Sequence, residues 1–527
     1  VVAAATNLQA TAAGDLQQAG SLKAQSLALR AGHDLTASGT LQSASTFDLQ
    51  AQRALTFAAQ GQAGGDIGMR AATLTTSQDA VLQGAGAIAL DSGTISSRGK
   101  LDAGSGLRVR SLGDLTLAGV AQGSGDVELT ATGALTNAAQ VFAGRTLTAQ
   151  AHSLENTAAG VLAGDGDVAL TAAAQLNNAG RVQAAGDLQM TAASLDQSGS
   201  ASAGRILHGT VAGTLDNRGN LIARDALQID AGTLRSSGQL GSQLDGVVAA
   251  ATALQASAGG DLQQAGSLKA QSIALQAGQD LTANGSLQSA STLDLQARRT
   301  LALNGQASSA ANATLNGASI TTSAAAMLQG GASISLAGDS IDSRGALDAA
   351  NDLTLRSGGD LMLGGVAQAG RDIALTAAGN LNNGAQVIAA RDLSVQAASA
   401  MNASDATLGA KRDLRVDVAG VLDNHGSLHG EQGLSLNSGS LLQRGRVYSG
   451  DALSIATTGA FENAGQLVSG KDLSITAGSI VSNGQLGSVT GALTLASQND
   501  IALQGVVSAA TTLQAAAGGD LSQAGTL

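Results

Sequence analysis

The chain contains no proline, no cysteine and no tryptophan among its 527 residues, and its aromatic residues are four Phe and one Tyr. Proline removes a backbone N–H donor, so its absence is expected where nearly every N–H belongs to a β ladder. Without cysteine there is neither a disulfide framework nor a thiolate metal site. The scarcity of aromatic rings favours a narrow core of Leu, Val and Ala over the core of an ordinary globular domain.

Charge of either sign is sparse, and the acidic residues exceed the basic ones. There are 39 Asp and Glu against 27 Lys and Arg, a formal net charge of −12 that is spread along the chain. This distribution favours solubility and disfavours a surface that follows phosphates, so no nucleic-acid partner is expected. No apolar run approaches the length of a membrane-spanning helix, and residues 1–41 show no signal-peptide pattern.

The most informative feature that is present is a large internal repeat. Residues 14–26 (GDLQQAGSLKAQS) recur without change as residues 260–272, and the same offset of 246 still relates residues 238–242 to 484–488. A third copy opens at residues 506–507. We therefore expect copies at 1–246 and 247–505 and the start of a third at 506–527, all in one continuous solenoid. A singular active site is not expected twice in one chain, so we predict that the protein is not an enzyme.

A shorter period of about twenty residues runs inside each large copy. Gly-Asp precedes an alternating apolar run at residues 125–129, 166–170 and 186–190. A second run carries Leu and, two residues later, Asn, as in Leu135 with Asn137 and Leu176 with Asn178. Asn-x-Gly then often leads into a third short run. Each unit thus predicts three brief strands separated by residues that tolerate a positive φ.

Three short strands cannot form a stable sheet alone, but they suffice for one turn of a parallel β-helix, in which stacking buries the apolar side chains. The predicted fold is all-β, a right-handed parallel β-helix (solenoid) that forms an elongated rod, with the hand taken from the general chirality of parallel crossovers. Stacked Asn amides are expected to hydrogen-bond along the axis. An α-helix is disfavoured by 71 Gly residues and by the alternation, and collagen by the missing Gly-x-y period.

Two patterns were weighed as metal sites. The recurrent Asp resembles a calcium-binding turn, but one carboxylate per twenty residues is too few for an oxygen cage, so a role at the strand entry is predicted. His425, His429 and Glu431 lie within seven residues, yet the positions 246 earlier hold Ala, Gln and Ala. A solvated turn is therefore predicted there, and no metal, cofactor or catalytic residue is expected.

Basic residues form three small clusters: Arg298 with Arg299; Lys411, Arg412 and Arg415; and Arg444 with Arg446 beside Tyr448. The last combines charge with the single tyrosine, so we select Arg444, Arg446 and Tyr448 as possible surface-contact residues. The alternative is that these charges only protect an exposed edge of the fold.

Several units resemble the haemagglutinin repeats of the filamentous haemagglutinin family, which includes adhesins and contact-dependent growth-inhibition exoproteins. They include residues 258–262 (AGGDL), 277–283 (AGQDLTA), 176–180 (LNNAG) and 215–219 (LDNRG). The resemblance implies a filament secreted through an outer-membrane transporter partner (two-partner secretion) and displayed on the surface of a Gram-negative bacterium. It also implies a host cell or a neighbouring bacterium as the contacted surface.

Two classes of function follow. In the first, which we favour, the segment is the structural shaft of a large exoprotein and holds a binding or toxic part away from the envelope. In the alternative, the surface itself binds host glycans or proteins through many weak contacts. Few residues of the hot-spot type are present, which favours the shaft.

One departure between the large copies predicts a local irregularity. Between Gly-Gln-Leu-Gly-Ser and the next Val-Val, the first copy has residues 243–246 and the second has residues 489–505. We expect a bulge or short loop near residues 242–247.

Overall fold

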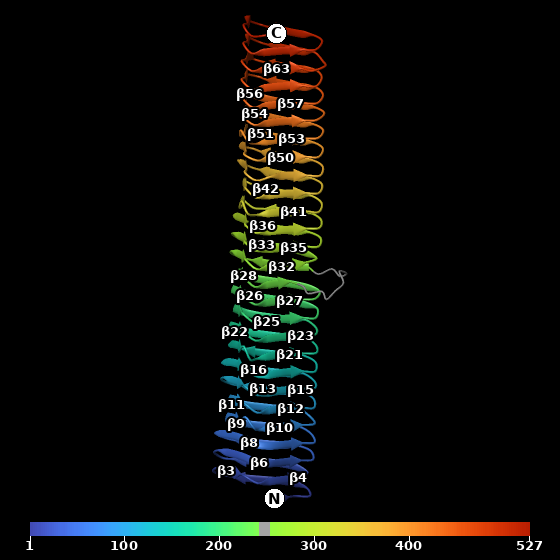
Figure 1. The fold of residues 1–527 in the computed structure, drawn as a ribbon. Coiled ribbons are helices and arrows are strands. Elements are labelled where there is room, and N and C mark those ends of the chain that lie inside the picture. The colour runs from blue at the N-terminus through green and yellow to red at the C-terminus, as the bar shows by residue number, and fades with distance from the viewer. Residues whose placement is uncertain (242–252) are drawn as a thin grey trace. The chain divides into compact units, whose positions relative to one another are not determined.

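The computed structural model describes residues 1–241 and 253–527, so the irregularity expected near residues 242–247 lies outside the described residues. The chain divides into two compact units, Val1–Ala270 and Gln271–Leu527. In both units the described regular structure is entirely β, and Figure 1 shows the short strands of each unit stacked turn upon turn.

One turn of the first unit consists of three strands, β13 (Leu107–Ser111), β14 (Leu115–Leu117) and β15 (Val120–Gly123). The next turn begins with β16 (Val127–Ala131), which pairs in parallel with β13 so that Leu107 lies opposite Val127. In the second unit β48 (Ile373–Ala377) pairs in parallel with β51 (Leu393–Ala397), again twenty residues on. The predicted parallel β-solenoid of about twenty residues per turn is confirmed, and its right-handed sense stays a prediction.

Some turns merge their first and second strands into one long strand. The first unit contains β22 (Val168–Asn178), β24 (Leu188–Gln197), β26 (Ile206–Asn217) and β28 (Ala226–Ser236), and the second contains β54 (Leu414–Asn424) and β56 (Leu434–Gln443). β22 pairs with β19 (Leu147–Ala151) through its first half and with β20 (Ser153–Asn156) through its second. A register shift marks the corner, as between Val418 and Val421 of β54.

The core consists of columns of apolar side chains that stack along each unit. Leu107, Val127, Leu147, Val168 and Leu188 are successive register partners, and each is at most 1% exposed. Alternate residues of the same strands face solvent, as period-two strands require. The column is continuous because every turn places an apolar residue at the same register position.

The expected asparagine ladder is confirmed. Asn137 donates to Asn156, Asn156 to Asn178 and Asn178 to Gln197, with N–O distances of 2.8, 2.7 and 2.9 Å. The second unit repeats the ladder from Asn383 through Asn402 and Asn424 to Gln443. These side chains are almost completely buried, so the ladder satisfies amides that would otherwise be costly to bury.

The reason predicted for the turn glycines was wrong. Among the described residues only Gly39 has a positive φ, 82°. The glycines that follow the Asn ladder are required by the close approach of successive turns: a Cβ on Gly445 would lie 2.0 Å from the carbonyl oxygen of Gly426. Backbone atoms of the adjacent turn occupy the space that any side chain would need.

Gly445→Ala is therefore expected to lower the free energy of unfolding by about 3 kcal/mol, because the turn must move to admit the methyl group. Gly384→Ala is the matched control, since its Cβ would meet only the oxygen of Leu363 at 3.4 Å. Denaturant unfolding of the two variants measures the difference. Equal stabilities would show that the close approach is not what selects glycine.

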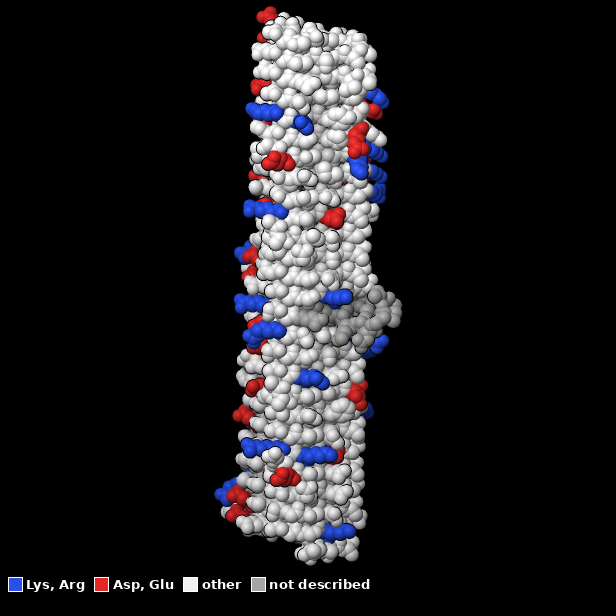
Figure 2. Space-filling view, viewed as in Figure 1, with Lys and Arg blue, Asp and Glu red and all other residues white. Residues whose placement is uncertain are grey.

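The recurrent Asp residues close turns at the entry of a strand, as predicted. The Oδ1 of Asp126 accepts the backbone N–H of Thr146 at 3.2 Å, and that of Asp280 accepts the N–H of Thr300 at 3.1 Å. An Arg of the following turn often joins the same carboxylate, as Arg145 does at 2.8 Å from Asp126. On the face shown in Figure 2, most charged side chains lie singly or beside an opposite charge within a largely uncharged surface, whereas several Lys and Arg side chains lie close together at the right edge of the upper part.

These turn carboxylates predict a loss of stability in acid. Hydrogen bonds from the side chain and backbone of Thr146 lower the pKa of Asp126 below its usual 3.8, and the backbone N–H of Thr300 does the same for the pKa of Asp280. A lowered folded-state pKa stabilises the fold above the unfolded-state pKa, and this stabilisation is lost as the pH falls below it. The midpoint temperature of thermal unfolding should therefore decrease as the pH is lowered from about 5 to about 2. A midpoint temperature that increases as the pH is lowered over this range would contradict the stabilising role of these carboxylates.

Candidate functional site

The selected surface residues lie on one turn of the second unit, which contains β56 and β57. Arg446 and Tyr448 belong to β57 (Arg446–Ser449), on either side of Val447, which is buried. Alternation along the strand therefore points both side chains outward. Arg444 lies two residues before β57, in the turn that follows the Asn ladder. The structure thus brings together all three residues that the sequence singled out.

Tyr448 has an aromatic partner that sequence reasoning missed. β55 (Ser427–Gly430) pairs in parallel with β57 and places His429 opposite Tyr448. The two rings stack with centroids 5.1 Å apart and planes inclined by 15°. His429 is therefore a strand residue, and the predicted solvated turn is wrong for it. The sequence gives only an approximate signal for this pair, because its spacing of 19 residues departs from the period of about twenty.

Arg444 and His425 share one carboxylate. Nη1 of Arg444 lies 2.5 Å from Oδ1 of Asp423, and Nε2 of His425 lies 3.1 Å from the same oxygen. Asp423 and His425 lie on one turn of the second unit, and Arg444 lies on the next turn. His425 therefore contacts the same carboxylate that pairs with Arg444. Within the described residues no group of three or more His, Cys, Asp or Glu is placed to hold a metal ion.

A hollow of about 490 Å³ lies beside these residues. Its floor includes Gly426, Gly445 and Gly465, whose backbones approach too closely for any side chain. Arg444 and Arg446 contribute to its lining from either side of Gly445. We call this feature, with Tyr448 and His429 beside it, the arginine hollow.

The other basic clusters are largely neutralised by neighbouring carboxylates. Arg299 lies 2.7 Å from Asp280, and Arg412 lies 2.8 Å from Asp392. Arg415 lies 2.6 Å from Asp417 on its own strand. These pairs are typical of solvated surface ion pairs, which contribute little to stability and offer no free cation to a ligand.

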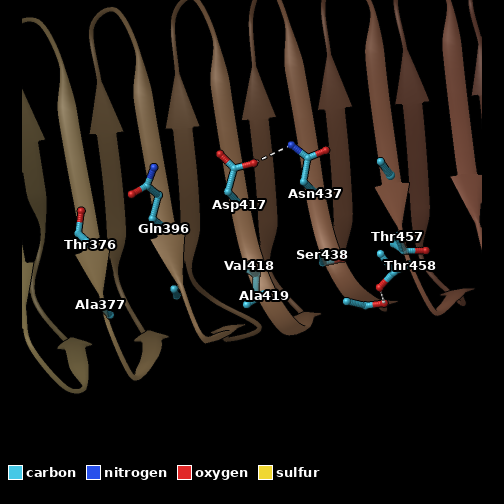
Figure 3. A pocket seen from close by; sticks show the side chains of 13 residues that line it. Thr376, Ala377, Gln396, Asp417, Val418, Ala419, Asn437, Ser438, Thr457 and Thr458 are labelled. Atoms are coloured by element: carbon cyan, nitrogen blue, oxygen red, sulfur yellow. Dashed lines mark hydrogen bonds between the residues drawn. The ribbon is translucent and has the colours of Figure 1, made fainter.

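A second, larger hollow of about 710 Å³ lies at the corner after the first strands of five turns, from β48 to β58 (Leu453–Thr457). Figure 3 shows Thr376, Gln396, Asp417 and Asn437 side by side along it, with Asn437 donating to Asp417 at 2.6 Å. Ser438 also lines it, and its hydroxyl is buried without a hydrogen-bond partner. Sequence reasoning did not find this hollow, because it depends on how the corners of the long strands are shaped.

Asp417 in that hollow is held as a carboxylate. Partial burial raises its pKa, but hydrogen bonds from Asn437 and Arg415 outweigh burial and lower it below the usual value. Because the only lining residue with an acidic side chain is Asp417, the described hollow lacks the pair of carboxyl groups that acid–base hydrolysis of a glycosidic bond requires.

Comparison with known protein families identifies the type of repeat in this chain. The haemagglutinin repeat model matches overlapping segments that cover the whole chain: residues 1–36, 24–68, 62–119, 120–189, 183–266, 236–297, 273–361, 329–465 and 427–527. The chain belongs to the haemagglutinin repeat family. Neither the curated proteins nor the solved structures yielded a match to it. Haemagglutinin repeats on a β-solenoid fit an adhesin-like structural role.

The haemagglutinin repeats contain no membrane-spanning helix among residues 1–241 and 253–527, where no helix has the required length and apolar character. The family is a structural and adhesin fold, and the expectation that the repeat region is not an enzyme stays a prediction.

Proposed function

We propose that this haemagglutinin repeat segment is a structural shaft of a large secreted exoprotein, which holds an adhesive or toxic part away from the cell envelope. The observation that carries the proposal is the repeated construction of each unit: apolar columns run through successive turns, and asparagine ladders and Asp turns recur in both units. Such interactions supply stability in proportion to the number of turns. They position no catalytic group.

The proposal is tested by a binding titration of the purified chain, confirmed as β-rich by circular dichroism, against whole target cells. An unrelated β-solenoid serves as the control. A shaft should bind no better than the control. Binding above the control that increases with the number of large copies would place the function on the repeat surface instead.

We further propose that the parent protein is exported through an outer-membrane transporter and displayed on a Gram-negative cell. Family membership and the absence of cysteine, which keeps the exported chain free of disulfides, support this proposal. Folding that propagates turn by turn outside the cell would help draw the chain outward. Secretion of a chain with several disrupted turns tests that step, and unchanged secretion would count against it.

A second candidate function is contact by the repeat surface with host glycans or proteins, with Arg444, Arg446 and Tyr448 as contact residues. The stacked His429 and Tyr448 rings favour it, because tyrosine and arginine are the residue types enriched at binding hot spots. If target cells bind the chain above the control, variants of these three residues are the first to compare.

A further inference from the structure

One guanidinium group of the arginine hollow has no carboxylate partner among the described residues. Arg444 is already engaged by Asp423, whereas Arg446 forms no ion pair within the described residues. The charged and titratable groups around them are Asp405 in the lining, Asp423 and His425 at the turn, Glu462 beside Arg444, and His429 on the neighbouring strand. Arg446 is therefore the guanidinium with free N–H donors, and the engaged Arg444 still presents donors beside it.

The side chains that characterise the arginine hollow occur in the second large copy and not at the matching positions of the first. At the matching positions of the first copy, 246 residues earlier, the side chains are small or uncharged: Ala179 for His425, Gln183 for His429, Ser198 for Arg444, Ser200 for Arg446 and Ser202 for Tyr448. Both copies use the same turns and the same ladder. Since the fold does not need these five residues, they are explained better by a contact than by stability.

The ring stack restricts what can bind. Because His429 and Tyr448 are register partners, their rings stack along the axis of the unit, and Val468 is the register partner of Tyr448 on its other side. Tyr448 is 43% exposed, and its stack on His429 covers one face of its ring. This arrangement is a poor binding site for a sugar ring, which needs an aromatic face to stack on. A peptide group or a carboxylate can instead form a hydrogen bond with the hydroxyl group of Tyr448.

We infer that the arginine hollow binds a carboxylate side chain of an extended acidic segment in a partner protein. Arg446 donates two N–H groups to the carboxylate, the geometry in which guanidinium pairs are strongest. Arg444 adds a second charge across Gly445, and the edge of Tyr448 supplies the apolar contact and a hydroxyl donor. Tyrosine beside arginine is the composition of a protein-binding hot spot. This inference rests on the second candidate function, for which it names the ligand, and it does not depend on the shaft.

Fluorescence anisotropy of the purified chain with labelled hexaglutamate at low salt tests the inference. We expect saturable binding that Arg446→Gln weakens by about tenfold and Tyr448→Ala weakens further. Arg298→Gln is the matched control: it removes the same charge from an exposed position of the same unit, and should change the affinity less than about twofold. Circular dichroism checks that each variant remains folded.

Three outcomes would overturn the inference. A failure of hexaglutamate to bind would disprove the inference. Equal weakening of binding by Arg446→Gln and Arg298→Gln would show that the peptide binds through general charge attraction. Tighter binding of an acidic oligosaccharide than of hexaglutamate would assign the hollow to glycans. None of these results bears on the shaft, which is tested on whole cells.

Discussion

Replacing Leu170 with Pro is expected to lower the free energy of unfolding by about 5 kcal/mol. Leu170 is completely buried in β22, with Ala149 and Met190 as its register partners in the adjacent turns. Proline removes a ladder N–H and replaces a core side chain with a smaller ring. The damage should be local, because each turn of a solenoid contacts only its neighbours.

Hydrogen exchange followed by mass spectrometry measures where protection is lost. We expect the loss in the turns that contain residues 147–151, 168–178 and 188–197, and unchanged protection in distant turns. Leu170→Met is the matched control, since it conserves volume and the backbone donor and should cost less than about 1.5 kcal/mol. Loss of protection throughout the first unit would mean that its turns do not behave as separable repeats.

Asn178→Ala is expected to cost about 3 kcal/mol, because it removes a completely buried member of the ladder and leaves two partners unsatisfied. Asn178 accepts a hydrogen bond from Asn156 and donates one to Gln197. Within the interior, unpaired amide groups cannot exchange these bonds for water.

The adjacent residue provides the control. Asn177 lies on the same strand with its side chain outward, and it accepts only a surface hydrogen bond from Gln175 at 2.8 Å. Asn177→Ala should change the stability by less than about 0.5 kcal/mol. Comparable denaturation midpoints for the two variants would show that the ladder contributes nothing beyond ordinary side-chain packing.

The fold could be predicted because a solenoid converts sequence period directly into contact. Residues about twenty apart become register partners, so Leu-x-Asn repeats such as Leu154-Glu155-Asn156 and Leu176-Asn177-Asn178 define both an apolar column and an amide ladder. The Gly-Asp repeats define the turns in the same way. The same logic shows which residues face solvent, because strands alternate strictly between the core and the surface.

What could not be predicted depends on turn length and on backbone shape. The stack of His429 on Tyr448 requires a spacing of 19 residues, whereas the turn of β13 and β16 requires 20, so a nominal period does not identify the pair. The larger hollow beside Asp417 depends on the register shift in β54. The role of turn glycines such as Gly445 was misassigned because close approach and positive φ select the same residue.

The most direct test of the shaft is to replace this repeat segment within the parent exoprotein by an unrelated β-solenoid with the same number of turns. Cell binding or target-cell inhibition by the parent protein is then measured at matched surface display. The shaft account predicts that the activity is retained with the replacement and is reduced when the segment is deleted. Loss of activity with an equally long, folded replacement would contradict it, because the residues of these repeats, and not the distance they span, would then carry the function.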